Sequence, residues 1–150
     1  MYNRSEIENK LKELMNREDI IKRFYHLRSI ENFIYFLDVI EDTQLKEKVY
    51  LILIEYFDVV KNEPIQDIHH CTKLFDEYIR PIGSVYEENV GFMPMIHAWV
   101  IIFWGVLLFV ILYMFSLPLV FYYLIGGGLL FYYGYVFKKR LQQKVYGFKW

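Results

Sequence analysis

Acidic residues are lacking after Glu88, and the segment 89–137 contains no Lys, Arg, Asp or Glu. All 18 acidic residues therefore lie in the first 90 residues together with 12 of the 17 Lys and Arg, which gives that part a net charge of −6. The remaining five cations all follow Phe137. The charge pattern divides the chain into an acidic part, an uncharged part and a basic end, and it excludes an ordinary soluble surface for the middle part.

Cysteine occurs once, as Cys71, so an intramolecular disulfide is excluded and a reducing compartment is favoured. The N-terminal sequence has no apolar core of a signal peptide, and its Glu residues do not suit an organellar transit peptide. The sequence contains no P-loop, no dinucleotide-binding glycine motif and no recognisable Ser/His/Asp arrangement. We therefore expect a protein that is not an enzyme and takes no cofactor.

The uncharged part contains two apolar runs, 96–115 and 119–137, each near the roughly 20 residues that a helix needs to cross a bilayer. Pro118 stands between them and disfavours a helix in the residue before it. One continuous helix would be about 60 Å long at ~1.5 Å per residue, twice what a bilayer buries. The sequence predicts a transmembrane hairpin of two helices within residues 91–137.

Basic residues directly follow the second run, as Lys138, Lys139, Arg140 and Lys144. Positive charge close to a span marks the cytoplasmic side, and two crossings return the chain to the side on which it began. We expect an integral membrane protein with both termini cytoplasmic, in a bacterial inner membrane rather than a eukaryotic organelle.

Amphipathic side chains lie near both predicted ends of the spans, where headgroup-level belts are expected. The residues predicted to lie at the membrane interface are His97, Trp99, Tyr122, Tyr123, Tyr132, Tyr133, Tyr135, Lys138, Lys139, Arg140 and Trp150. His97 is close enough to the edge to be an interfacial anchor, with a proton or ligand site as the alternative.

Three consecutive glycines, Gly126, Gly127 and Gly128, fall near the middle of the second span. Glycine costs a helix about 1 kcal/mol relative to alanine, so the triplet needs a reason. Small residues let helices approach closely in lipid, and Gly134 and Gly105 could share the contact. We expect close packing within the hairpin or between copies of the chain, with a kink or gating hinge as the alternative.

Residues 1–90 show helical periodicity and predict an all-α bundle of about four helices. Capping patterns place helix starts at Ser5, at Asn16 and at Thr43, and Pro64 suits the first turn of another helix. That last helix is expected to stop before Pro81, and Ser84 with Glu87 is read as one more capping pair.

The run "DIHHC" contains residue types that bind metals, with Asp67 and His70 spaced to share a helical face. A helical metal site needs matching carboxylates or further His and Cys ligands at suitable spacings, and no second Glu-x-x-His occurs. We expect a helix surface with a buried Cys71 and no metal.

The basic end, residues 138–150, combines cations with Val145, Tyr146, Phe148 and Trp150. This composition is typical of a segment lying on an anionic lipid surface. Two alternatives are a plain anchor after the span and docking of the tail on the acidic bundle. Nucleic acid is not expected to bind, since a net charge of −6 repels a phosphate backbone.

These features predict a cytoplasmic helical bundle that serves as a protein-interaction or sensing module, with a cytoplasmic protein partner and a self-associating hairpin as its tether. One alternative is an oligomeric pore-forming or membrane-disrupting effector, an architecture that also occurs among prokaryotic antiviral systems, by analogy only. A second alternative is a hairpin that shapes the membrane.

Overall fold

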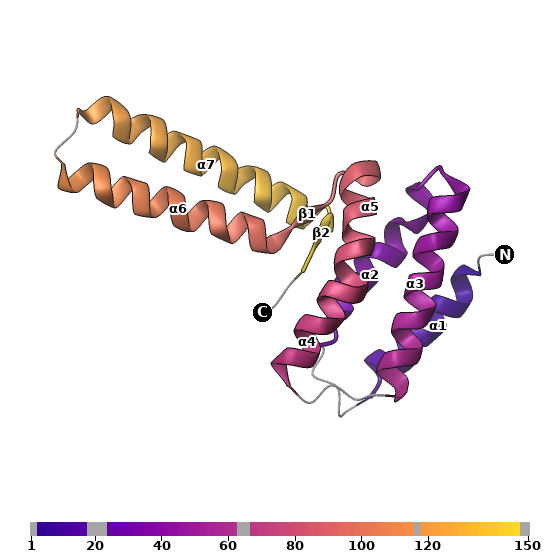
Figure 1. The fold of residues 1–150 in the computed structure, drawn as a ribbon. Coiled ribbons are helices and arrows are strands. Elements are labelled where there is room, and N and C mark those ends of the chain that lie inside the picture. Colours follow the sequence, from indigo (N-terminus) through magenta and orange to yellow (C-terminus); the bar gives the residue numbers. More distant parts are fainter. Residues whose placement is uncertain (1–2, 18–23, 63–66, 116–117, 148–150) are drawn as a thin grey trace.

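A computed structural model describes residues 3–17, 24–62, 67–115 and 118–147. For residues 96–99 and 112 it describes the backbone but not the side chains. The chain is mainly helical, as predicted, and falls into a helical bundle and a long helical hairpin (Figure 1). The bundle elements are α1 (Arg4–Met15), α2 (Leu27–Phe36), a 3-10 turn (Leu37–Val39), α3 (Thr43–Asn62), α4 (Ile68–Leu74), a π-helical turn (Phe75–Ile79) and α5 (Arg80–Val90).

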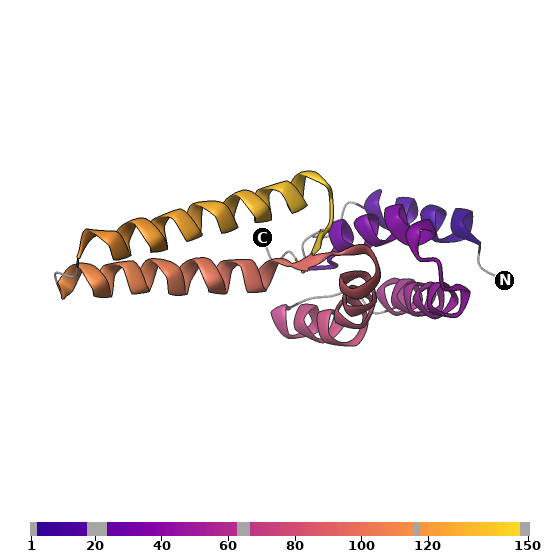
Figure 2. The same cartoon turned by 90° about the horizontal axis from the view of Figure 1, so that it is seen from above.

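The hairpin consists of α6 (Met95–Met114) and α7 (Leu119–Leu141), which lie side by side and extend away from the bundle (Figures 1 and 2). Two short strands close its base: β1 (Met93–Pro94) directly precedes α6, and β2 (Val145–Tyr146) follows α7. The strands pair in parallel, with Met93 opposite Val145. This strand pair was not predicted from the sequence.

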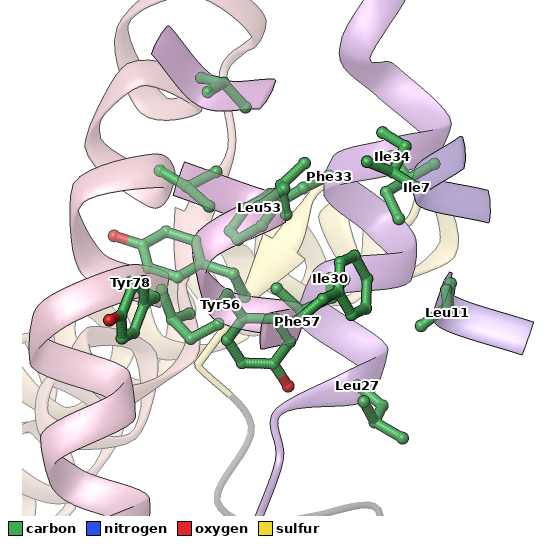
Figure 3. Packing of buried hydrophobic residues seen from close by; sticks show 14 of the residues in the cluster. Ile7, Leu11, Leu27, Ile30, Phe33, Ile34, Leu53, Tyr56, Phe57 and Tyr78 are labelled. Atoms are coloured by element: carbon green, nitrogen blue, oxygen red, sulfur yellow. The ribbon is translucent and has the colours of Figure 1, made fainter. Parts of the chain in front are cut away.

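The bundle has two layers, with α1 and α2 in one and α3 and the α4–α5 segment in the other (Figure 2). Periodic apolar residues from every helix meet between the layers, because each helix has one face to bury. Figure 3 shows part of this core, in which Ile7, Ile30, Phe33, Leu53 and Tyr56 are almost completely buried. Tyr56 donates its hydroxyl hydrogen to the backbone oxygen of Tyr25, so a ring in the core keeps its polar group satisfied.

Pro81 does not end its helix, which corrects the sequence prediction. The helix continues from Ile68 to Val90 through a π-helical turn at Phe75–Ile79, where the Arg80 N–H donates to the Phe75 oxygen five residues earlier. Proline has no N–H and its ring presses on the carbonyl four residues before it. The wider π turn accommodates both effects, as π-bulges commonly do within helices.

Helix starts also differ from the predicted caps. Asp42, not Thr43, caps α3 by accepting from the backbone N–H groups of Gln44 and Leu45 at 2.8 and 3.2 Å. Asp67 caps α4 in the same manner, accepting from the His70 N–H at 2.8 Å. Both are short acidic side chains at helix N-termini, where a side-chain oxygen satisfies N–H groups that have no helical partner.

The remaining predicted caps do not form. Ser5 donates to the Asn3 side chain and Glu8 pairs with Arg4, so no capping box opens α1. Ser84 lies inside α5 and donates to the Pro81 oxygen. Asn16, expected to begin a helix, is the residue that closes α1, and residues 18–23 after it lie outside the described part of the chain. Pro64 lies outside the described residues.

Candidate functional site at the base of the hairpin

The hairpin is attached to the bundle at both of its ends. The chain leaves α5 through Gly91 and Phe92, enters β1 and rises into α6. It returns through α7 and ends, in the described part, at Val145–Gly147, which lies against α2 and α5. We call Lys144–Gly147 with its surroundings on α2, the π turn and α5 the tail-docking site.

Two buried polar groups of α2 bind the backbone of the tail. The Asn32 side-chain nitrogen donates to the Val145 oxygen at 2.8 Å, and the Gly147 N–H donates to the Ser29 hydroxyl oxygen at 3.0 Å. Ser29 is fully buried and Asn32 is 5% exposed. Buried polar groups left without partners are costly, so these contacts tie the fold of α2 to the presence of the tail.

Tyr146 fills the centre of the tail-docking site. It is 3% exposed, and its ring lies 5.7 Å from the Phe33 ring and 6.5 Å, nearly parallel, from the Phe75 ring in the π turn. Its hydroxyl donates to the Glu87 carboxylate. Burial first, and then the Glu87 bond, raise the pKa of Tyr146 far above its usual value, so the phenol stays protonated.

Gly83 provides the space for this ring. A Cβ at Gly83 would lie 2.3 Å from the Tyr146 Cε2 atom, so any side chain there collides with the tail. Gly147 is the second glycine that the site requires. Its φ of +76° is one that side chains rarely adopt, and a Cβ there would approach Phe75 to 3.1 Å.

Two lysines of the basic end cap the C-terminus of α5 by donating hydrogen bonds to its last carbonyl oxygens. The Lys139 amine donates to the Gly91 oxygen at 2.7 Å, and the Lys144 amine donates to the Val90 oxygen at 3.1 Å. Helix C-termini carry partial negative charge and unpaired carbonyls, so cations are stabilising there. From the sequence, Lys139 was predicted to lie at the membrane interface and Lys144 to mark the cytoplasmic side of the second span; the capping role is one that sequence reasoning missed.

The interpretation of the tail as a membrane-surface segment is wrong for Val145 and Tyr146, which are 1% and 3% exposed inside the protein. Docking on the bundle, the alternative, is confirmed for Lys144–Gly147. Residues 148–150, including Trp150, lie outside the described part of the chain, as do the side chains of His97 and Trp99.

Of the glycines predicted to pack closely, only Gly105 contacts the other helix of the hairpin in the described part of the chain. Gly105 packs against α7, since a Cβ there would lie 2.2 Å from the Leu129 Cδ2 atom. At the other predicted positions a Cβ would meet no described atom within 4 Å; these are Gly126, Gly127, Gly128 and Gly134. The triplet therefore does not pack against α6 within the hairpin.

The predicted interfacial tyrosines are spread over α7. Tyr122 is half-buried and its ring lies 5.4 Å from the Phe109 ring of α6, whereas Tyr123 is 75% exposed. Near the base, Tyr132 is half-buried, and Tyr133 and Tyr135 are exposed. Lys138 and Arg140 are exposed as well.

Within the described residues, α7 is the one helix long and apolar enough to cross a membrane, and it is almost entirely unburied. The segment Val100–Ile111 of α6 is apolar but shorter. Side chains across this segment are exposed, including Phe103 at 64% and Trp104 at 61%. Exposed apolar surface of this extent marks contact with lipid or protein.

The "DIHHC" run lies at the start of α4, with Cys71 5% exposed and its Sγ atom 3.4 Å from the His26 Nε2 atom. His26 is buried and also contacts the Cys71 backbone oxygen at 3.1 Å. Nowhere in the described ranges do three or more His, Cys, Asp or Glu residues gather as metal ligands would.

Comparison with protein-family models, with curated proteins and with solved structures gives no match for this chain.

Proposed function

We propose that the protein is an integral membrane protein whose helical bundle is a cytoplasmic interaction or sensing module, held at the membrane by the α6–α7 hairpin crossing the bilayer twice. The length and composition of α7 support one crossing. The uncharged sequence of α6, twenty residues long, and its position beside α7 support the other. Lys138 and Arg140, exposed at the base, support a cytoplasmic location for that end.

The observation that carries this proposal is the return of the chain to the bundle. Met93, before α6, and Val145, after α7, are partners in one strand pair, and the Met93 N–H donates to the Lys144 oxygen at 3.0 Å. This return supports a topology in which both membrane exits lie on one side of the bilayer. The short strand pair would also transmit a tilt of either helix to α2 and α5, which is what a sensing module needs.

The partner that we propose for the bundle is a cytoplasmic protein. Its net charge of −6 favours a basic partner surface and disfavours nucleic acid. Ion pairs such as Lys10 with Asp58 at 2.7 Å lie on the surface of the bundle. The bilayer, including anionic lipids at the basic end, is the second partner.

Site-directed labelling tests the two crossings. In a Cys71→Ser background, Phe115→Cys places a thiol beside the far turn of the hairpin, and Gln142→Cys places one after α7; both positions are exposed. A membrane-impermeant thiol reagent applied to intact bacterial cells is expected to label position 115 alone, and inverted vesicles should label position 142 alone. Labelling of both positions from one side would refute the two-span hairpin.

An oligomeric pore-forming effector is the second candidate function, and the open glycines of α7 favour it. A Cβ at Gly126, Gly127 or Gly128 would meet no described atom within 4 Å, so another copy of the chain could approach the α7 backbone closely there. The protomer count of the full-length protein in nanodiscs separates the two functions. A closed ring of five or more copies supports the pore, whereas a monomer or dimer supports the tethered module.

A further inference from the structure

An open hollow lies on the outward face of α7 close to the base of the hairpin. It is lined by Leu130, Phe131, Gly134, Tyr135 and Lys138, which recur at helical spacing along one face. Gly134 is one of its lining residues, and a Cβ there would meet no described atom within 4 Å. Phe131 and Tyr135, 81% and 45% exposed, flank the glycine.

The hollow changes from apolar to cationic along the helix. Lys138 is four residues beyond Gly134, about 6 Å at 1.5 Å per residue, and Leu130 lies the same distance on the other side. In the proposed membrane orientation, Lys138 lies at headgroup depth and Leu130 at acyl-chain depth. A phospholipid of the cytoplasmic leaflet has the same order of groups along its length.

Charge selects an anionic lipid. The Lys139 and Lys144 amines are already bound to carbonyl oxygens at the end of α5. Lys138 and Arg140 form no side-chain hydrogen bond or ion pair with the described residues, and no acidic residue follows Glu88 in the sequence. Of these two cations only Lys138 lines the hollow, and an anionic headgroup placed there lowers the electrostatic energy of its amine.

A second copy of the chain fits the hollow less well. Two parallel α7 helices packed symmetrically through Gly134 would bring the two Lys138 side chains to the same level. Like charges at such a contact are unfavourable, especially where lipid lowers the dielectric constant. A bound lipid would cover the hollow without this repulsion.

We propose that the face of α7 from Leu130 to Lys138 binds one anionic phospholipid, with its phosphate at Lys138 and an acyl chain over Gly134. This proposal rests on the proposed membrane hairpin and names the lipid partner and its site. The site shares Lys138 with the basic end that was expected on anionic lipid, but it lies along α7, because the tail residues Val145 and Tyr146 are enclosed by the bundle.

Native mass spectrometry of the full-length protein, released from nanodiscs of phosphatidylcholine containing phosphatidylglycerol, tests the site. The wild-type protein is expected to retain one phosphatidylglycerol per protomer in preference to phosphatidylcholine. Lys138→Gln should lower that retention about fivefold, the effect of one cation near an anionic surface. Arg140→Gln is the matched control, since it removes the same charge two residues, about 200°, around the helix.

A second pair of variants tests the apolar part. Gly134→Leu fills the hollow and should abolish selective retention, whereas Gly128→Leu, which also replaces an open glycine but lies on a different face, should leave it within twofold. Equal losses in both members of either pair, equal retention of the two lipids, or a dimer that Gly134→Leu dissociates would overturn the proposal.

Flotation of the wild-type protein with vesicles distinguishes failure of the membrane hairpin from failure of the lipid site alone. Protein that fails to float, or that alkaline carbonate strips from the vesicles, overturns both the membrane hairpin and the lipid site. Protein that stays in the vesicles but shows no phosphatidylglycerol preference overturns the lipid site alone.

Discussion

Replacing Gly83 by alanine is expected to have opposite effects with and without the Tyr146 ring. In the wild-type protein the new Cβ would lie 2.3 Å from the Tyr146 Cε2 atom, so the ring has to leave the tail-docking site or α5 has to shift. The ring is hemmed in by Phe33 and Phe75 and held by its bond to Glu87, so it has no nearby position to take.

The magnitude follows from two opposing effects. Losing a buried aromatic side chain costs about 3–5 kcal/mol in comparable core sites. Alanine is about 1 kcal/mol better than glycine within a helix, which offsets part of that loss. Gly83→Ala should therefore lower the free energy of unfolding of the bundle by about 2–4 kcal/mol. In a Tyr146→Ala background the collision is absent, and the same change should raise that free energy by about 1 kcal/mol.

Chemical denaturation of the four proteins of this double-mutant cycle, in a detergent that leaves α6 and α7 helical, measures both values. The two residues should show an interaction energy of about 3–5 kcal/mol, far beyond the few tenths expected for independent sites. Additive effects, or stabilisation by Gly83→Ala in the wild-type background, would show that Tyr146 does not occupy the site.

Three further results are expected. Lys144→Met should lower bundle stability by about 1 kcal/mol by removing the amine bound to the Val90 oxygen, measured by denaturation. The raised pKa of Tyr146 contributes stability that is fully present below the unfolded tyrosine pKa of about 10 and is lost as pH rises above it, so Tyr146→Phe should flatten the alkaline fall in stability; an unchanged slope would contradict this. Gly105→Leu should lower the melting temperature of the hairpin in detergent, whereas Gly127→Leu, with open space around it, should not; equal effects would refute the packing described.

The helical character of the chain and the break between α6 and α7 were predictable because they depend on local patterns. Apolar periodicity marks helix faces, and Pro118 between two apolar runs marks the hairpin turn. The continuation of the helix through Pro81 was not predictable from local patterns. Proline within a helix is costly unless tertiary packing supports a widened turn, and the packing of Phe75 against His26 and Tyr146 is a tertiary feature.

The tail-docking site was predictable only as an alternative. One signal was present in α2, where the polar residues Ser29 and Asn32 share a face with apolar Phe33. Polar residues on a buried face need partners, but their spacing does not say that the partner is a backbone more than a hundred positions away. Gly83 is a similar case, because the need for space becomes visible only when the Tyr146 ring is in place.

Amide hydrogen exchange of the C-terminal residues is the sharpest test of whether the tail docks on the bundle. The measurement follows the C-terminal peptide that contains Val145–Gly147 in the full-length protein reconstituted in bilayers. Because these residues are buried and bound to α2 and β1, their amides should exchange as slowly as those of α5. Exchange of this peptide at the rate of an unfolded chain, while α2 and α5 remain protected, would show that the tail does not dock on the bundle.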